Sequence, residues 1–331
     1  MSESLAAGSR ILDGRYMLLR LLYTRPRVNL YLGWRLARGC DNRQSGLVAV
    51  RELVLDGLPA GARARVEQAT WEEFLSPGVV SGLRLPAAGV TERLWIGAEQ
   101  GRLYLVMRLF ESQTAGSFVM PLADLLQQPR WPRWLDTQVA VAWTIQLARV
   151  VARLHRQGTI LADLDPSTII IDASDRAIRS AWSPLLLACW PPSPCFWPER
   201  EDVQAYFPLR LRRENVFAAP ELLSRLYDER ADVYAPGAML YLLLTGRAPV
   251  SASRRLLYAR KQSGGLELVS PRFFCPALPL ALEEIVLRAL ALEPRERYPS
   301  VFALIEALEA VQTVPLKPVS GALPARRPGP G

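Results

Sequence analysis

Leu47–Leu53 reads LVAVREL, a short apolar run in which Arg51 is the single basic residue. The run predicts a β-strand with one cationic side chain near its end. The chain has two lysines, Lys261 and Lys317, and both lie far downstream of this strand. Any task that requires a cation in this strand therefore falls to an arginine.

The period of the hydropathy pattern changes once along the chain, at about residue 109. Up to about residue 109, alternation with a period of two predicts strands at 15–22, 28–36, 47–55, 93–98 and 102–109. In the same region 63–75 is predicted as a helix, because Val66, Ala69 or Thr70, and Glu73 or Phe74 recur at turn spacing. Later segments have helical periodicity, and helices are predicted at 136–157, 232–246, 253–263, 279–292 and 299–311.

Short motifs follow the strand in a fixed order. Leu161–Thr168 reads LADLDPST, Ala219–Glu221 reads APE, Asp232–Gly237 reads DVYAPG, and Arg297–Ser300 reads RYPS. Together with the first strand of the region, Gly14–Leu22 (GRYMLLRLL), and the run Leu103–Met107, these motifs resemble the protein kinase family, and bacterial Ser/Thr kinases in particular. The resemblance implies an α+β, bilobal protein-kinase-like fold with a small β-rich N-lobe and a large, mainly α-helical C-lobe. The implied organisation is an N-terminal extension (1–10), the N-lobe (11–110), the C-lobe (111–311) and a Pro/Gly-rich flexible tail (312–331).

The resemblance also assigns a nucleotide pocket, and that pocket is degenerate. Arg51 stands where the family has the lysine that holds the nucleotide phosphates, Glu67 stands at the glutamate of the αC helix, and Met107 is the gatekeeper. The stretch 23–29, at the place of the glycine-rich loop, contains no glycine. Pro26 also removes one backbone N–H from that stretch. We expect Arg51 to pair with Glu67, with Asp163 as its competing partner.

The catalytic loop keeps one chemical residue. Asp163 matches the catalytic base, whereas Asp165 replaces the lysine that steadies the γ-phosphate and Thr168 replaces a magnesium-binding asparagine. Residues 181–183, at the DFG position, contain no carboxylate. Asp172 or Asp175 could substitute there, and Asp163 could instead serve to cap backbone N–H groups.

Residues with structural roles in the family are retained. Glu221 and Arg297 match a buried ion pair, and Asp232 matches an acceptor for backbone N–H groups of the catalytic loop. Retained supports beside altered catalytic positions indicate a pseudokinase, Asp163 being a vestigial base.

The predicted function is therefore that of a signalling scaffold or allosteric partner that binds proteins, such as an active kinase or its substrate. No cofactor is expected. One alternative is an atypical Ser/Thr kinase that uses ATP and Mg²⁺. Another is a nucleotide- or anion-sensing module in which Arg25 and Arg27 meet phosphate. The proline- and tryptophan-rich stretch within 183–213 is predicted either to dock a partner or to cover the cleft.

Composition narrows the class of protein further. The formal net charge of +8 comes almost entirely from dispersed arginines, which fits a solvated surface or an anionic partner, and no nucleic-acid-binding motif accompanies them. Four scattered cysteines lack the spacing of a zinc site. No signal peptide and no membrane-spanning run is recognised, so a cytoplasmic location is expected.

Overall fold

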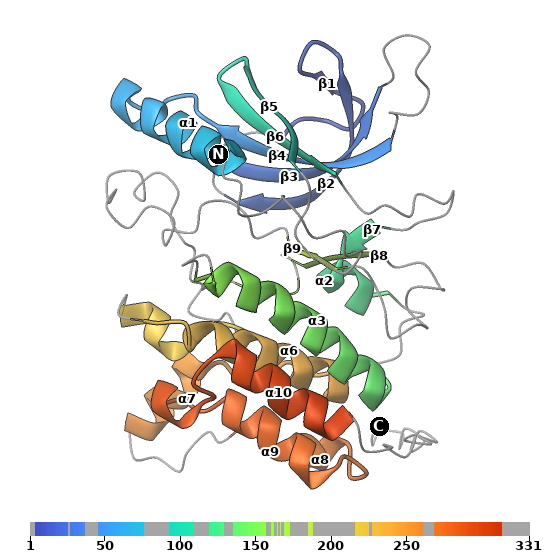
Figure 1. Cartoon of the computed structure of the whole chain (residues 1–331), viewed down its shortest axis with the longest axis vertical. Coiled ribbons are helices and arrows are strands. Elements are labelled where there is room, and N and C mark those ends of the chain that lie inside the picture. Colours follow the sequence, from blue (N-terminus) through green and yellow to red (C-terminus); the bar gives the residue numbers. More distant parts are fainter. Residues whose placement is uncertain are drawn as a thin grey trace, which may run out of the picture.

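The chain forms two parts, a β-rich N-terminal part and a helical C-terminal part, which lie one above the other in Figure 1. The computed structural model describes residues 4–25, 27–36, 46–75, 93–108, 119–128, 135–156, 160–161, 164, 166, 169–172, 185–187, 216–224, 227–260 and 268–312.

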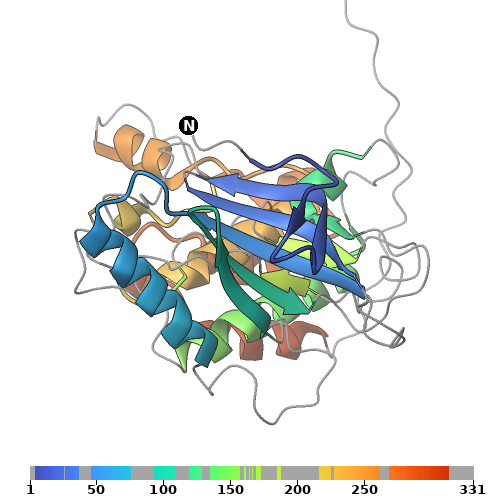
Figure 2. The same ribbon diagram turned by 90° about the horizontal axis from the view of Figure 1, so that it is seen from above.

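The N-terminal part is an antiparallel sheet of six strands in the order β1-β2-β3-β4-β6-β5. The helix α1 (Ala60–Leu75) runs along one side of this sheet (Figure 2) and buries Ala62, Val66 and Thr70, which are four residues apart. The strands are β1 (Arg10–Ile11), β2 (Tyr16–Arg25), β3 (Val28–Arg35), β4 (Gly46–Val54), β5 (Arg93–Glu99) and β6 (Arg102–Arg108).

The central strand β4 is buried on both faces, and its alternate residues serve two separate cores. Ala49 and Leu53 pack in one core with Val66 of α1. Val48 and Val50 pack in the other core, on the face that β1 covers. Successive side chains of a strand point to opposite faces, so Arg51 faces the α1 side and the next residue faces away from it.

The C-terminal part is built around α6 (Ala231–Thr245), which packs against α3 (Thr137–His155) and α9 (Leu280–Ala289). All residues of α6 except Leu242 are buried. A small antiparallel sheet lies between the large sheet and α3 in Figure 1 and consists of β7 (Val119–Pro121), β8 (Ile169–Asp172) and β9 (Leu185–Leu187). The remaining α-helices are α2 (Leu122–Leu126), α7 (Ala252–Arg260), α8 (Pro271–Phe274) and α10 (Val301–Gln312).

The elements predicted from periodicity are present, with ends that differ by a few residues. The α+β class and the division into a β-rich and a helical part are confirmed. The strands β7 to β9 and the helices α2 and α8 were not predicted, because each of these strands and helices is five residues or shorter and shows too little periodicity. The extension expected at 1–10 is paired with the sheet where it is described, because Gly8 N donates to Leu18 O and Leu18 N donates to Ser9 O. Among the described residues, no helix combines the length and apolar character needed to cross a bilayer.

Candidate functional site

Arg51 is enclosed in the sheet. Its exposed fraction is 1%, and it lies on the same face of β4 as Ala49 and Leu53. Met107 of β6 lies opposite Ala49 in the strand register, so the structure brings Arg51 and Met107 to one face, the face that α1 covers. Arg51 makes at least one interaction within the protein, although its buried Nε atom has no hydrogen-bond partner among the described residues.

The predicted pair between Arg51 and Glu67 is wrong. Glu67 instead accepts a hydrogen bond from Arg63 Nε at 2.9 Å, an i,i+4 pair on the outer surface of α1, and the described residues include no ion pair between Glu67 and Arg51. The reason is helical phase, because Val66 faces the sheet and the next residue is turned about 100° away from it. The alternative partner, Asp163, lies outside the described residues.

The turn between β2 and β3 stands where a glycine-rich loop was sought. Arg25 pairs with Val28 across the hairpin, and Arg27 has a φ of +62°. The Arg27 Nη1 atom donates to Val54 O at 3.1 Å and to Asp56 O at 2.6 Å. The Nη1 group of Arg27 is therefore bonded to backbone carbonyls of the chain itself.

A buried carboxylate lies on the opposite face of the sheet. Glu52 has no exposed surface, and its Oε1 accepts from Arg102 Nη1 at 2.6 Å. Its Oε2 accepts from Asn29 Nδ2 at 2.6 Å and from the Tyr31 hydroxyl at 3.1 Å. The Tyr104 hydroxyl lies 3.4 Å from Oε1. These donors satisfy the carboxylate, and a buried charge requires such partners.

The network around Glu52 also holds the N-terminal segment. Leu5 N donates to the Tyr31 hydroxyl at 2.8 Å. Burial, and then the Glu52 carboxylate, raise the pKa of Tyr31 to about 12 against the opposing effect of the Leu5 hydrogen bond. Sequence analysis missed this network because it depends on cross-strand pairing of Glu52 with Asn29 and Tyr104, which only the register reveals.

Asp163, Asp165, Thr168 and the 181–183 stretch all lie outside the described residues. Nearby, Asp232 Oδ2 accepts from Leu161 N at 2.6 Å, the contact with the catalytic loop that the sequence predicted. His155 Nε2 lies 2.8 Å from the same oxygen, and this histidine, the single one of the chain, was not singled out from the sequence. The described residues contain no group of three potential metal ligands.

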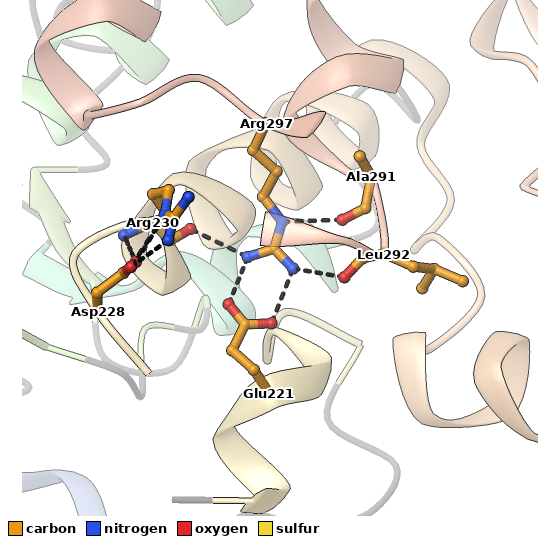
Figure 3. A network of polar contacts seen from close by, with 6 residues as sticks. All are labelled: Glu221, Asp228, Arg230, Ala291, Leu292 and Arg297. Atoms are coloured by element: carbon orange, nitrogen blue, oxygen red, sulfur yellow. Dashed lines mark hydrogen bonds and ion pairs between the residues drawn. The ribbon is translucent and has the colours of Figure 1, made fainter. Parts of the chain in front are cut away.

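The Glu221–Arg297 ion pair is present, and its geometry is bidentate (Figure 3). Arg297 Nη1 and Nη2 donate to the two carboxylate oxygens at 2.6 and 2.8 Å. The remaining N–H groups donate to the backbone oxygens of Arg230, Ala291 and Leu292, as Figure 3 shows. The pair thus fastens the 3-10 helix Pro220–Ser224, which carries Glu221, to the start of α6 and to the turn after α9.

Chemically, the described residues give a set of supports: Glu221–Arg297, Asp232 with Leu161, and Glu52 with its donors. Each of these charges is satisfied by partners within the chain. Arg51 and Met107 share one face of the sheet, but Glu67 is turned away from it.

Comparisons with known proteins place this architecture. No family model matches the chain. The tyrosine-protein kinase MasK of Myxococcus xanthus is 39% identical over 115 residues, which are 34% of this chain and 18% of that protein. The serine/threonine-protein kinase PrkC of Bacillus subtilis is 23% identical over 300 residues, which are 88% of this chain and 39% of that protein. The chain thus spans well under half the length of these relatives.

Solved structures give the same answer for the fold. The kinase domain of PknI from Mycobacterium tuberculosis superposes with a TM-score of 0.57 at 19% identity, covering 93% of this chain and 99% of that domain. The predicted bilobal protein-kinase-like fold is confirmed.

Proposed function

We propose that this chain, a protein-kinase-like relative of bacterial serine/threonine kinases, is catalytically impaired and acts by binding other proteins, as a signalling scaffold or an allosteric partner. The observation that carries the proposal is the state of Arg51, the cation at the position of the phosphate-binding lysine. Its exposed fraction is 1%, so its charge is not presented to solvent or to a solvent-borne ligand.

Arginine at this position differs from lysine in more than length. In general, the planar guanidinium of arginine can form several hydrogen bonds in a fixed geometry, whereas lysine presents a compact charge on a flexible stem. Phosphoryl transfer relies on positioning and electrostatic stabilisation, and losing one preorganised donor costs roughly 10²–10³ in rate. The sequence alters the glycine-rich loop and both magnesium-binding positions as well, and such losses, though not additive, compound the impairment.

The second support for the proposal is the state of the scaffold. The Glu221–Arg297 pair and the contact from Leu161 N to Asp232 are complete. These contacts hold the shape of the helical part and take no part in phosphate chemistry. A fold with its supports in place offers surfaces for partners, which agrees with a binding function.

Nucleotide titration tests the proposal directly. Isothermal calorimetry and thermal-shift measurements would use the full chain with ATP, with and without Mg²⁺, and an active bacterial kinase domain as the positive control. We expect no micromolar, Mg²⁺-dependent binding. Arg51→Lys serves as the matched variant, because it restores the family residue at one position; we expect it to remain without binding, since the other positions are unchanged.

The titration also separates the alternatives. Metal-independent binding of ATP would favour a nucleotide sensor. Metal-dependent binding, together with transfer of the ATP γ-phosphate to the chain itself or to a protein, would support an atypical Ser/Thr kinase. The relatives MasK and PrkC are both protein kinases, which favours that second candidate. In that case Asp163→Ala should abolish transfer without abolishing ATP binding.

A further inference from the structure

The side chain of Arg27 forms hydrogen bonds within the chain that have no part in binding phosphate. The guanidinium reaches from the β2–β3 hairpin to the segment between β4 and α1, where it bonds Val54 O and Asp56 O. The backbone joins the same two places, because Val54 N donates to Arg27 O at 2.8 Å. The hairpin and the β4–α1 connection are therefore joined by side-chain and main-chain bonds at one point.

The β4–α1 connection is itself shaped to receive the guanidinium. Leu58 N donates to Leu55 O at 3.1 Å and closes a turn, in which Gly57 has a φ of +72°. A Cβ atom added to Gly57 would lie 3.7 Å from Arg27 Nη2, so the turn runs directly beneath the guanidinium. Leu55 N also donates to Gly101 O at 2.9 Å, which ties the β5–β6 hairpin to the same place.

The backbone of Arg27 adds an energetic argument. A φ of +62° is unfavourable for a side chain with a Cβ atom and is free of this cost for glycine. Hydrogen bonds from a charged donor to carbonyl oxygens are among the stronger ones. The hydrogen bonds of the arginine side chain therefore offset the energetic cost of a backbone conformation that glycine would adopt without strain.

We propose that Arg27 is an internal latch, which fixes the β2–β3 turn to the β4–α1 connection and so sets the position at which α1 begins. α1 starts at Ala60, four residues after Asp56, and Arg63 N already bonds Pro59 O. The latch holds these elements in one conformation without a ligand. The inference deepens the proposed function, since it explains how the N-terminal part keeps its shape without bound phosphate. Only this interpretation rests on the proposed function; the contacts of Arg27 do not.

Hydrogen exchange of the full chain, read by mass spectrometry without nucleotide, tests the latch. The variants are Arg27→Gly and Arg27→Asn, which both tolerate the positive φ and lack the reach to Asp56 O. We expect exchange at 54–58 and at the first turn of α1 to accelerate roughly tenfold in both variants, as suits loss of hydrogen bonds from a charged donor. Arg27→Lys retains the charge and one donor group, so it should fall between these variants and the wild type.

Arg63→Ala is the matched control, because it also removes one arginine near the start of α1 but breaks an exposed pair with Glu67. We expect it to leave exchange at 54–58 unchanged. Unchanged exchange at 54–58 in Arg27→Gly would overturn the latch, as would an equal acceleration in α6, which would indicate global destabilisation. Because no nucleotide is used, ATP binding by the wild type would overturn the proposed function and leave the latch standing.

Discussion

At the scale of single residues, burial separates two arginines that lie side by side in Figure 3. The Arg297 side chain has no exposed surface and donates from all three nitrogens, whereas Arg230 pairs with Asp228, whose side chain is 50% exposed. In an exposed ion pair the two charges replace hydrogen bonds to water with an interaction of similar strength, so the pair contributes little to the free energy of unfolding. A buried arginine that loses its carboxylate keeps an uncompensated charge, which is costly.

Removing the Glu221 carboxylate should therefore destabilise the protein strongly. We expect Glu221→Ala to lower the free energy of unfolding by about 3–5 kcal/mol, measured by urea denaturation. Asp228→Ala, which breaks the neighbouring exposed pair and one hydrogen bond from the Arg230 backbone N–H, should lower the same quantity by only about 1 kcal/mol. Equal effects of the two substitutions would contradict the role given to the buried pair.

Tyr31 predicts a dependence of stability on alkaline pH. Its pKa is raised from 10.0 to about 12 in the folded chain, chiefly by burial. Between these values the unfolded state has lost the phenolic proton and the folded state retains it. The contribution of Tyr31 to the free energy of unfolding is therefore fully present below pH 10 and is lost as the pH rises towards 12. We expect Tyr31→Phe to weaken this fall, measured as the difference in urea midpoint between pH 8 and pH 11. A fall of the same size in the variant would show that other groups, such as Tyr104, cause it.

At the scale of elements, periodicity predicted which segments are strands and helices but not which way single side chains face. α1 illustrates this, because the stripe of Val66 and Thr70 is visible in the sequence, whereas Glu67 was assigned from the resemblance to the αC glutamate of the kinase family. Following the stripe by three or seven residues leads to position 73 and not to position 67. The error arose because a match to a family position does not determine which face of the helix a residue occupies.

The contacts that hold β4 show a different limit of the sequence. Glu52 lies beside Arg51, and both are buried on opposite faces of one strand. The chain offers many arginines as partners for Glu52, and the selection of Arg102 follows from the pairing of β4 with β6. Long-range pairing of this kind depends on register, which local hydropathy does not specify.

The approach of α6 to α9 predicts a test at the level of helix packing. A Cβ atom at Gly237 would lie 2.6 Å from the Cβ atom of Ala289, closer than packed carbon atoms allow. Alanine gains about 1 kcal/mol in helix propensity over glycine, but overpacking costs about 1–3 kcal/mol. We expect Gly237→Ala to be destabilising by roughly 1 kcal/mol in urea denaturation, the difference between these two terms.

The double variant Gly237→Ala, Ala289→Gly is the control for this packing argument, because it returns the space that the new methyl group needs. We expect it to be more stable than the sum of the two single changes. Simple additivity of the two substitutions would show that the helices separate freely and that the close contact carries no constraint.

At the scale of the whole molecule, the described contacts link distant parts of the chain into one framework. Arg297 follows α9 and reaches back to Glu221 and to the start of α6, and Asp232 at that same start bonds Leu161 after α3. The framework therefore joins three segments that are widely spaced along the chain. A protein that functions through its surfaces depends on such a framework, whereas an enzyme depends on it and on its catalytic residues together.

This difference gives the prediction that decides between a scaffold and an atypical kinase. We expect Arg297→Ala to fail in a deletion-complementation assay and to show a sharply lowered melting temperature, because a loss of about 3–5 kcal/mol approaches the total stability of a domain, about 5–15 kcal/mol. We expect Asp163→Ala, at the catalytic base position, to complement fully and to change the melting temperature little. Arg297→Lys, which keeps the charge but loses the bidentate geometry, should lie between these variants in stability. If Asp163→Ala lost function at an unchanged melting temperature, chemistry at Asp163 would be required, and the chain would have to be regarded as an active kinase of unusual composition.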